Sequence, residues 1–179
     1  MKTEAINELV ELIRSGMKLD ADHCVAYNQM VPIPPDEGTF VAVGILDSKP
    51  FAGSLSYGAP GDAAGAEGVT APGTPELLER QTLNVREVFS IHIQSRDNSA
   101  RRRRWELIFS LTNTAAVQAQ EARGFQIARL PAGFVDSSIT EGAERLNRYT
   151  ATLVVLSAKE REGAVDWYEK AGFLVTPSP

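Results

Sequence analysis

The stretch TLNVREVFSIHIQSRDNSARRRRWELIFSLTNTAAVQAQEARGFQIARL, residues 82–130, decides the fold. In its first part, apolar residues occupy alternate positions and most of the residues between them are polar. This spacing predicts a β-strand that is buried on one face only. Glu87 and Val88 interrupt the alternation, which indicates a bulge or a change of environment. The alternating apolar residues are Leu83, Val85, Phe89, Ile91 and Ile93.

A long helix is predicted after this strand. Asp97 and Asn98 supply N-cap chemistry, and Gly124 suits the C-cap position. At about 1.5 Å per residue, such a helix would be about 39 Å long. Residues Phe125 to Leu130 then return as a second strand. The apolar residues at helical spacing are Trp105, Ile108, Leu111, Ala115, Ala119 and Ala122.

Further elements are predicted on both sides of this stretch. Residues Thr3 to Ser15 carry an apolar stripe opposite several glutamates, which predicts a short amphipathic helix ended by Gly16. Thr39 to Leu46 and Thr150 to Ser157 have strand composition, and the second run is apolar on both faces. The remaining assignments are a connection at Pro131–Leu146, a turn at Lys159–Gly163, and a returning strand or short helix at Ala164–Ala171.

Residues 51–79 are rich in glycine, alanine and proline. A loop of this length is unusual inside a compact domain unless it is disordered or ordered by a partner. We therefore expect an arm or loop inserted between two strands, with its roots near Phe51 and Leu83.

Together these elements predict an α+β fold in a single domain, residues 1–179. The sheet is expected to be mostly antiparallel with about four to five strands, and an N-terminal helix and one long helix are expected on one face. A chain of 179 residues is long enough to bury one core.

The composition argues against several classes of protein. A net charge of −5 gives no sign of a general nucleic-acid binder. The only cysteine, Cys24, excludes an internal disulfide, and one cysteine with two histidines cannot furnish a zinc cage. No apolar run approaches the roughly 20 residues of a membrane span, and the first residues carry too many charges for a signal peptide. We therefore expect a soluble, non-exported chain without membrane contact.

The sequence contains no motif for catalysis or cofactor binding. Gly58 to Gly65 lacks the Gly-Lys-Ser/Thr of a phosphate-binding loop, and there is no Gly-x-Ser-x-Gly nucleophile elbow. Cys24 and His92 would form a thiolate pair only if the fold brought them together, whereas a lone cysteine is usually a small apolar filler. His92 is expected on the solvent face of its strand. No enzyme, metal or cofactor is expected.

Four consecutive arginines, Arg101 to Arg104, are the strongest anomaly in the sequence. Successive helical residues are about 100° apart, so these four cannot share one solvated face. They also lie near the positive end of the helix dipole. Two interpretations stay open: the helix starts later and the arginines are solvated, or they contact acids or phosphates on another chain. The candidate acids are Glu76, Asp136, Glu141 and Glu144.

Four features in order carry a resemblance to a known family. They are the leading helix at residues 6–15, the Tyr27-Asn28-Gln29 approach to a proline-rich turn and strand at 32–46, the strand Val88–Ser95 with an arginine-bearing helix ending Arg123-Gly124-Phe125, and the Asn147-Arg148-Tyr149-Thr150 approach to the strand Leu153–Leu156. In this order they resemble the tail terminator, or neck, proteins of long-tailed bacteriophages. A strand apolar on both faces, a polar arm and an arginine cluster are also features that a partner surface would explain.

The resemblance implies a structural virion protein with no active site. Members form rings, usually hexameric, that cap the tail tube and present a surface to the head connector. It therefore implies a homo-oligomer, with tail tube protein and a head–tail connector or adaptor as partners, and DNA passing through the lumen without specific binding. The expected location is the virion neck, after assembly in the host cytoplasm. The expected subunit or partner contacts are Phe51, Tyr57, Arg86, Glu87, Arg101, Arg102, Arg103 and Arg104.

Two alternative functions fit parts of the sequence. The run Asp166 to Phe173 looks like the ending of GCN5-related N-acetyltransferases, which are small acyl-transferring enzymes. Their glycine-rich pyrophosphate loop has no counterpart in Arg96 to Arg104, which contains no glycine. The Arg101–Arg104 cluster also fits a nucleic-acid-binding module.

Overall fold

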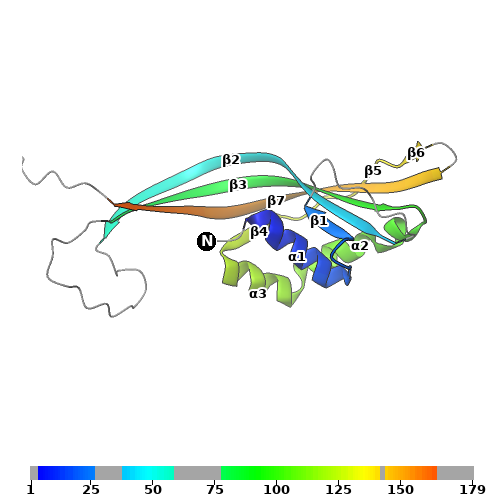
Figure 1. Cartoon of the computed structure of the whole chain (residues 1–179), viewed down its shortest axis with the longest axis horizontal. Helices are drawn as coiled ribbons and strands as arrows, with labels where there is room; N and C mark the ends of the chain where they lie inside the picture. Colours follow the sequence, from blue (N-terminus) through cyan, green and yellow to red (C-terminus); the bar gives the residue numbers. More distant parts are fainter. Residues whose placement is uncertain (1–3, 27–37, 59–77, 142–143, 165–179) are drawn as a thin grey trace, which may run out of the picture. The chain divides into compact units, whose positions relative to one another are not determined.

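The computed structural model describes residues 4–26, 38–58, 78–141 and 144–164. This part of the chain is an α+β structure with three helices and a mixed sheet of seven strands (Figure 1). It divides into two compact units. Unit 1 comprises Met1–Phe51 and Asn84–Ala158, and unit 2 comprises Ala52–Leu83 and Lys159–Pro179.

The main path of the sheet has the order β1-β2-β3-β7-β4. The strands β5 and β6 also pair with β7 and lie off this path. β1 is parallel to β2, whereas β4, β5 and β6 are antiparallel to β7. The strands are β1 (Cys24–Ala26), β2 (Phe40–Gly58), β3 (Leu78–Ser95), β4 (Phe125–Arg129), β5 (Val135–Asp136), β6 (Ile139–Glu141) and β7 (Glu144–Ala164).

The predicted α+β class is confirmed, but the sheet has more strands than the expected four to five. The additional strands are short: β1 and β6 have three residues each and β5 has two. Runs of this length are too short to show an alternating pattern. The segment 131–146, predicted to be only a connection, contains β5 and β6.

The core of unit 1 forms where β3 meets the helices and β7. Phe89, Ile91 and Ile93 of β3 are fully buried, as the alternation predicted. Glu87 is 7% exposed and accepts a hydrogen bond from Ser157 at 3.4 Å. Glu87 therefore lies on the buried face of β3, where a hydrogen-bonded acid takes the place of an apolar side chain. Other fully buried aliphatic residues include Leu9, Ile13, Val41, Val43, Leu107, Leu111, Leu153 and Val155.

The N-terminal helix α1 (Ala5–Met17) presents its apolar stripe to this core. It ends at Lys18, which has a left-handed φ of 52°, and not at Gly16 as predicted. Gly16 is instead a helical residue at a close helix contact. In Figure 1 the three helices of unit 1 lie on the same side of the sheet.

The predicted single long helix is wrong, because the chain breaks at Asn113. The two helices are α2 (Ser99–Thr112) and α3 (Thr114–Arg123). Asn113 adopts an extended conformation, with ψ of 164°, and its side chain accepts a hydrogen bond from the Ala116 N–H at 2.8 Å. It therefore caps a new helix. The predicted C-cap at Gly124 is confirmed, with φ of 70° and a 3.0 Å hydrogen bond to the Gln120 carbonyl.

The predicted buried stripe of this helical region is only partly correct. Leu111 is buried, but Trp105 is 53% exposed, and Ala115 and Ala122 are also exposed. The observed buried face is rotated relative to the predicted one, because the break at Asn113 separates the region into two helices with their own orientations. The face that contacts the core contains Ala100, Leu107, Ser110, Leu111 and Ala116.

Several predicted loops are strands instead. Residues 51–58 belong to β2 and residues 78–83 to β3, so the predicted arm is confined to a shorter interval. The part of the arm at residues 59–77 lies outside the described residues, as do residues 165–179. The turn predicted at 159–163 is wrong, because β7 continues to Ala164. Residues 159–163 are all exposed, so this part of the strand has no buried face.

Unit 2 contains the end of β2, the start of β3 and the end of β7. The Arg80 guanidinium forms an ion pair with Glu162 at 2.6 Å, and the Ser56 hydroxyl donates to the Arg80 carbonyl at 3.5 Å. Leu55 and Tyr57 are 52% and 56% exposed. Unit 2 therefore displays apolar side chains at its surface.

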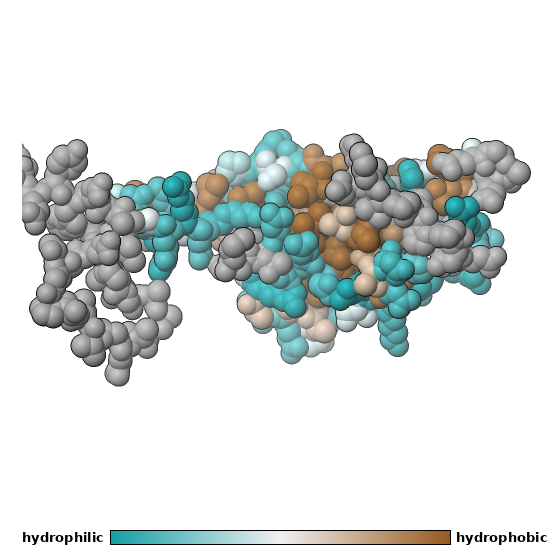
Figure 2. Space-filling model, in the orientation of Figure 1, coloured by the Kyte–Doolittle hydropathy of each residue, from teal (hydrophilic) through white to brown (hydrophobic). Residues whose placement is uncertain are grey.

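No helix within the described ranges is sufficiently long and apolar to cross a bilayer. Figure 2 shows hydrophobic residues gathered at the surface of unit 1 over the strands, with hydrophilic residues prevailing over the helices. In β2 the exposed apolar residues of unit 1 are Ile45, Leu46 and Phe51.

Candidate functional site

The junction between β3 and α2 is fixed by a compact set of hydrogen bonds. The Asp97 carboxylate accepts from the Ser99 N–H at 2.8 Å, and the Ser95 hydroxyl accepts from the Ala100 N–H at 3.0 Å. The Asn147 amide of β7 donates to the Asp97 carbonyl at 2.7 Å. These contacts set the position of the first turn of α2 relative to β7.

The charge of Asp97 contributes to the same junction. Hydrogen bonds from the Ser99 side chain and N–H are the main reason that the pKa of the Asp97 carboxyl lies below its usual value, and the nearby Arg102 charge lowers it further. The carboxylate form is therefore the one that caps the helix. Asp97 performs this task in place of Asn98, whose side chain makes no capping hydrogen bond.

The structure separates the four consecutive arginines into two pairs. Arg102 forms an ion pair with Asp97 at 3.6 Å. Arg103 pairs with Glu106 at 2.9 Å and donates a hydrogen bond to the carbonyl of Met17, at the end of α1. These two guanidinium groups are thus satisfied by their own chain.

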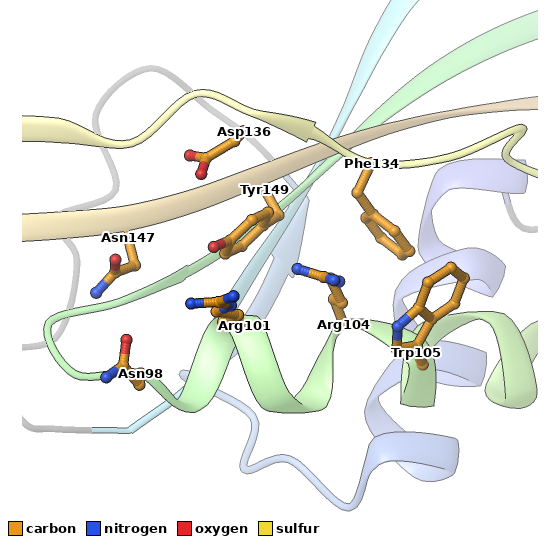
Figure 3. Close-up of a pocket in the computed structure, with 8 residues that line it drawn as sticks. All are labelled: Asn98, Arg101, Arg104, Trp105, Phe134, Asp136, Asn147 and Tyr149. Atoms are coloured by element: carbon orange, nitrogen blue, oxygen red, sulfur yellow. The ribbon is translucent and has the colours of Figure 1, made fainter.

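Arg101 and Arg104 instead line a pocket of about 430 Å³ in unit 1 (Figure 3). They are three residues apart and therefore lie on the same side of α2. Asn98 and Asn147 contribute polar amides to the lining, and Asp136 contributes a carboxylate. The pocket is thus built by α2, by β7 and by the segment that includes β5.

Aromatic rings form the remaining walls of the pocket. Trp105 and Phe134 meet edge to face, with their ring centroids 5.4 Å apart and their planes at 87°. The guanidinium carbon of Arg104 lies 5.1 Å from the Tyr149 ring centroid and 5.7 Å from that of Trp105. In Figure 3 the side chains of Arg104 and Tyr149 point toward one another. Arg104 is therefore held by cation–π contacts.

The charges around the pocket are not balanced by the chain. Within the described residues, neither Arg101 nor Arg104 has an acidic ion-pair partner, and the Arg104 Nε atom is buried without a hydrogen-bond acceptor. The only acid among the lining residues is Asp136, whose Oδ1 atom accepts from the Ser138 N–H at 3.0 Å and from its hydroxyl at 2.6 Å. The pocket is suited to a negatively charged group.

The residues considered for nucleophilic chemistry are inert in this structure. Cys24 is buried and donates to the Val10 carbonyl at 3.5 Å, and burial raises its pKa to about 12. The thiol is therefore protonated at neutral pH, as expected for an apolar filler. His92 is half-buried, with Nδ1 3.0 Å from the Thr150 hydroxyl. In the described ranges, no three His, Cys, Asp or Glu side chains form a group able to hold a metal ion.

The other predicted contact residues are not among the residues that line this pocket. Phe51 is 58% exposed and Arg86 is also exposed, both in unit 1, whereas Tyr57 is exposed in unit 2. Glu87 is buried. Only the arginines among the predicted contact residues contribute to the pocket.

Sequence reasoning identified the arginines and one acid near them, Asp136, but not the other residues of the pocket. Phe134, Asn147 and Tyr149 were assigned to a connection or to the start of a strand, with no link to the arginines. The spacing of Arg101 and Arg104 is the one available signal, because residues three apart on a helix project together. Their partners come from elements distant in the chain.

Comparisons with models of known protein families and with curated proteins give no match. The functional conclusion therefore rests on the residues of this chain.

Proposed function

We propose that this chain is a structural virion protein of the tail terminator or neck type. Copies of the chain would form a ring, with six subunits, that caps the tail tube and joins it to the head connector. The order of helices and strands that resembles this family supports the proposal. The exposed apolar side chains described below support it independently, because assembly would cover them.

The observation that carries the proposal is an aromatic patch on unit 1, formed by the exposed Trp105 and Phe109 and the partly buried Phe134. Trp105 is 53% exposed and Phe109 is 70% exposed. Phe109 follows Trp105 by one helical turn, and Trp105 contacts Phe134, so the three rings are neighbours. Large aromatic residues dominate the binding energy of many protein interfaces.

A ring also requires a second, different surface to receive the first. A head-to-tail contact repeated about an axis closes into a ring when each subunit presents two complementary patches. In β2 of unit 1, Leu46 is 62% exposed and Phe51 is 58% exposed, and they are candidates for the second surface. In the proposed assembly Arg86 and Tyr57 contact partners, and residues 59–77 reach a neighbouring subunit.

The proposed partners follow from this assembly. They are further copies of the chain, the tail tube protein and the head–tail connector, with DNA passing through the lumen without specific binding. The proposed location is the virion, and no catalytic step or cofactor is part of the proposal.

Light scattering coupled to size-exclusion chromatography tests whether the chain forms a ring-sized oligomer, and electron microscopy of the same sample gives the symmetry of that oligomer. We expect a closed oligomer for the natural chain, in the absence or presence of tail tubes. The variant Phe109→Ser should lower the oligomeric fraction severalfold. Val117→Ser is the matched control, because Val117 is also exposed, at 46%, but lies on α3 outside the patch.

A chain that stays monomeric and does not associate with tail tubes would overturn the proposal. Equal oligomeric fractions for Phe109→Ser and Val117→Ser would remove the aromatic patch from the interface. Far-ultraviolet circular dichroism of both variants separates a lost contact from a lost fold.

A further inference from the structure

Two of the four consecutive arginines are left without an anion by the fold itself. Arg102 has Asp97 at 3.6 Å, and Arg103 has Glu106 at 2.9 Å. Arg101 and Arg104 have no acidic ion-pair partner in the part of the chain that the structure describes, and both line the same pocket. The pocket therefore gathers the two arginines of this run that have no acidic partner among the described residues.

Their surroundings add to this positive character. The first turn of α2 begins beside the pocket and carries the positive end of the helix dipole, part of which the Asp97 carboxylate offsets by accepting from the Ser99 N–H. Asn98 also lines the pocket, and its amide is not used to cap the helix. Against these groups stands one carboxylate, that of Asp136, which already accepts two hydrogen bonds from Ser138.

Arg104 is prepared for binding before any ligand arrives. Its guanidinium lies between the Tyr149 and Trp105 rings, with centroid distances of 5.1 and 5.7 Å. Stacking of this kind restricts the side chain while its outer N–H groups remain able to donate. A preorganised guanidinium loses less conformational entropy on binding than a mobile one.

We propose that this pocket binds an oxyanion, a carboxylate or a phosphate, that is attached to a flat apolar group. Arg101 and Arg104 donate hydrogen bonds to the oxyanion, since guanidinium groups match the geometry of both anions. The flat group lies against Trp105 and Phe134. A volume of about 430 Å³ exceeds what a bare phosphate or acetate would fill, so the aromatic wall is part of the site.

Four small probes separate the contributions of charge and ring. Phenyl phosphate and phenylacetate carry both features but differ in the anion, inorganic phosphate carries the anion alone, and benzyl alcohol carries the ring alone. Binding is followed by the fluorescence of Trp105 in the full chain with Trp167→Phe, which removes the only other tryptophan. Comparison of the two aryl anions identifies which oxyanion the pocket prefers.

Arg101→Gln and Arg102→Gln form a matched pair of variants on adjacent helical positions. We expect Arg101→Gln to weaken binding of the preferred aryl anion by at least about fivefold, because a charge-assisted hydrogen bond is lost. Arg102→Gln should change it by less than about twofold, because Arg102 is engaged with Asp97 and does not line the pocket.

Several results would overturn the proposal. One is the absence of saturable binding by both aryl anions. Others are an equal loss of aryl-anion affinity in Arg101→Gln and Arg102→Gln, and binding of benzyl alcohol as tight as that of the aryl anions. Inorganic phosphate binding as tightly as phenyl phosphate would also contradict it, because the aromatic wall would then contribute nothing.

Discussion

Gly16 of α1 and Ser110 of α2 lie at the closest contact between these two helices. A Cβ atom added to Gly16 would overlap the Cβ of Ser110 and would lie 2.8 Å from its Cα. Ser110 is 2% exposed, and its hydroxyl donates to the Leu107 carbonyl at 2.7 Å, so it has little room to move. The helices can approach this closely only because residue 16 has no side chain.

The variant Gly16→Ala should therefore be less stable than the natural chain. Overlap in a packed interface costs roughly 1–3 kcal/mol, which exceeds the gain of about 1 kcal/mol that alanine gives in a helix. Urea unfolding gives the free energy of unfolding of both proteins. Gly133→Ala is the control, because nothing lies within 4 Å of a Cβ at that position, and it should cause no loss. An unchanged or higher stability for Gly16→Ala would contradict the observed helix contact.

The contact of Arg103 with α1 leads to a second prediction. Its guanidinium donates to the Met17 carbonyl at the end of α1 and pairs with Glu106. Replacement by glutamine should lower the free energy of unfolding by about 1–2 kcal/mol, because a charge-assisted hydrogen bond to a helix end is lost. The neighbouring Arg102→Gln should cost less than about 0.5 kcal/mol, since the Arg102 side chain is 74% exposed. Urea unfolding of both variants checks the difference, and equal losses would contradict it.

The strand β3 and the start of α2 were predictable because each is encoded locally. In β3, the alternation of Phe89, Ile91 and Ile93 corresponds directly to buried positions. The break at Asn113 was missed, although asparagine between two threonines is a recognisable N-cap signal. The continuous helical spacing on both sides of it concealed the new helix start.

The pocket was less predictable because its parts are distant in the chain. The hydrogen bond that places Asn147 beside Asp97 joins residues 50 positions apart. No local pattern links the Tyr149 ring to Arg104, since their contact depends on the register between β7 and its neighbours. The sequence therefore indicated which arginines were unusual, and only the fold showed which two share a site.

A third prediction concerns the ion pair between Glu8 of α1 and Arg123 of α3. The Glu8 side chain is only 10% exposed, so the adjacent Arg123 charge is the main compensation for its carboxylate. Arg123→Gln should therefore cost about 1–3 kcal/mol, because it leaves a largely buried carboxylate unpaired.

A double-mutant cycle checks this pair. Glu8→Gln in the Arg123→Gln background should recover part of the lost stability, because it removes the unpaired charge. Arg14→Gln is the control, because Arg14 pairs with Glu11 at the surface, where an ion pair contributes little. If Arg123→Gln and Arg14→Gln lower the free energy of unfolding by the same small amount, the pair between Glu8 and Arg123 does not stabilise the fold.

The last prediction is a pH dependence that originates at His92. Burial is the main cause that lowers the pKa of His92 below its ordinary value of 6.5, and the charge of Arg148 lowers it further. The native state therefore binds the proton more weakly than the unfolded state, and protonation favours unfolding. The stability that depends on neutral His92 is fully present above the pKa of His92 in the unfolded state, about 6.5. It is lost as the pH falls from there toward the lower pKa of His92 in the folded state. Urea unfolding of the natural chain and of His92→Gln, at about pH 7.5 and about pH 5, measures this loss. The natural chain should lose more stability than the variant over this interval, and parallel pH profiles would show that His92 is not the responsible group.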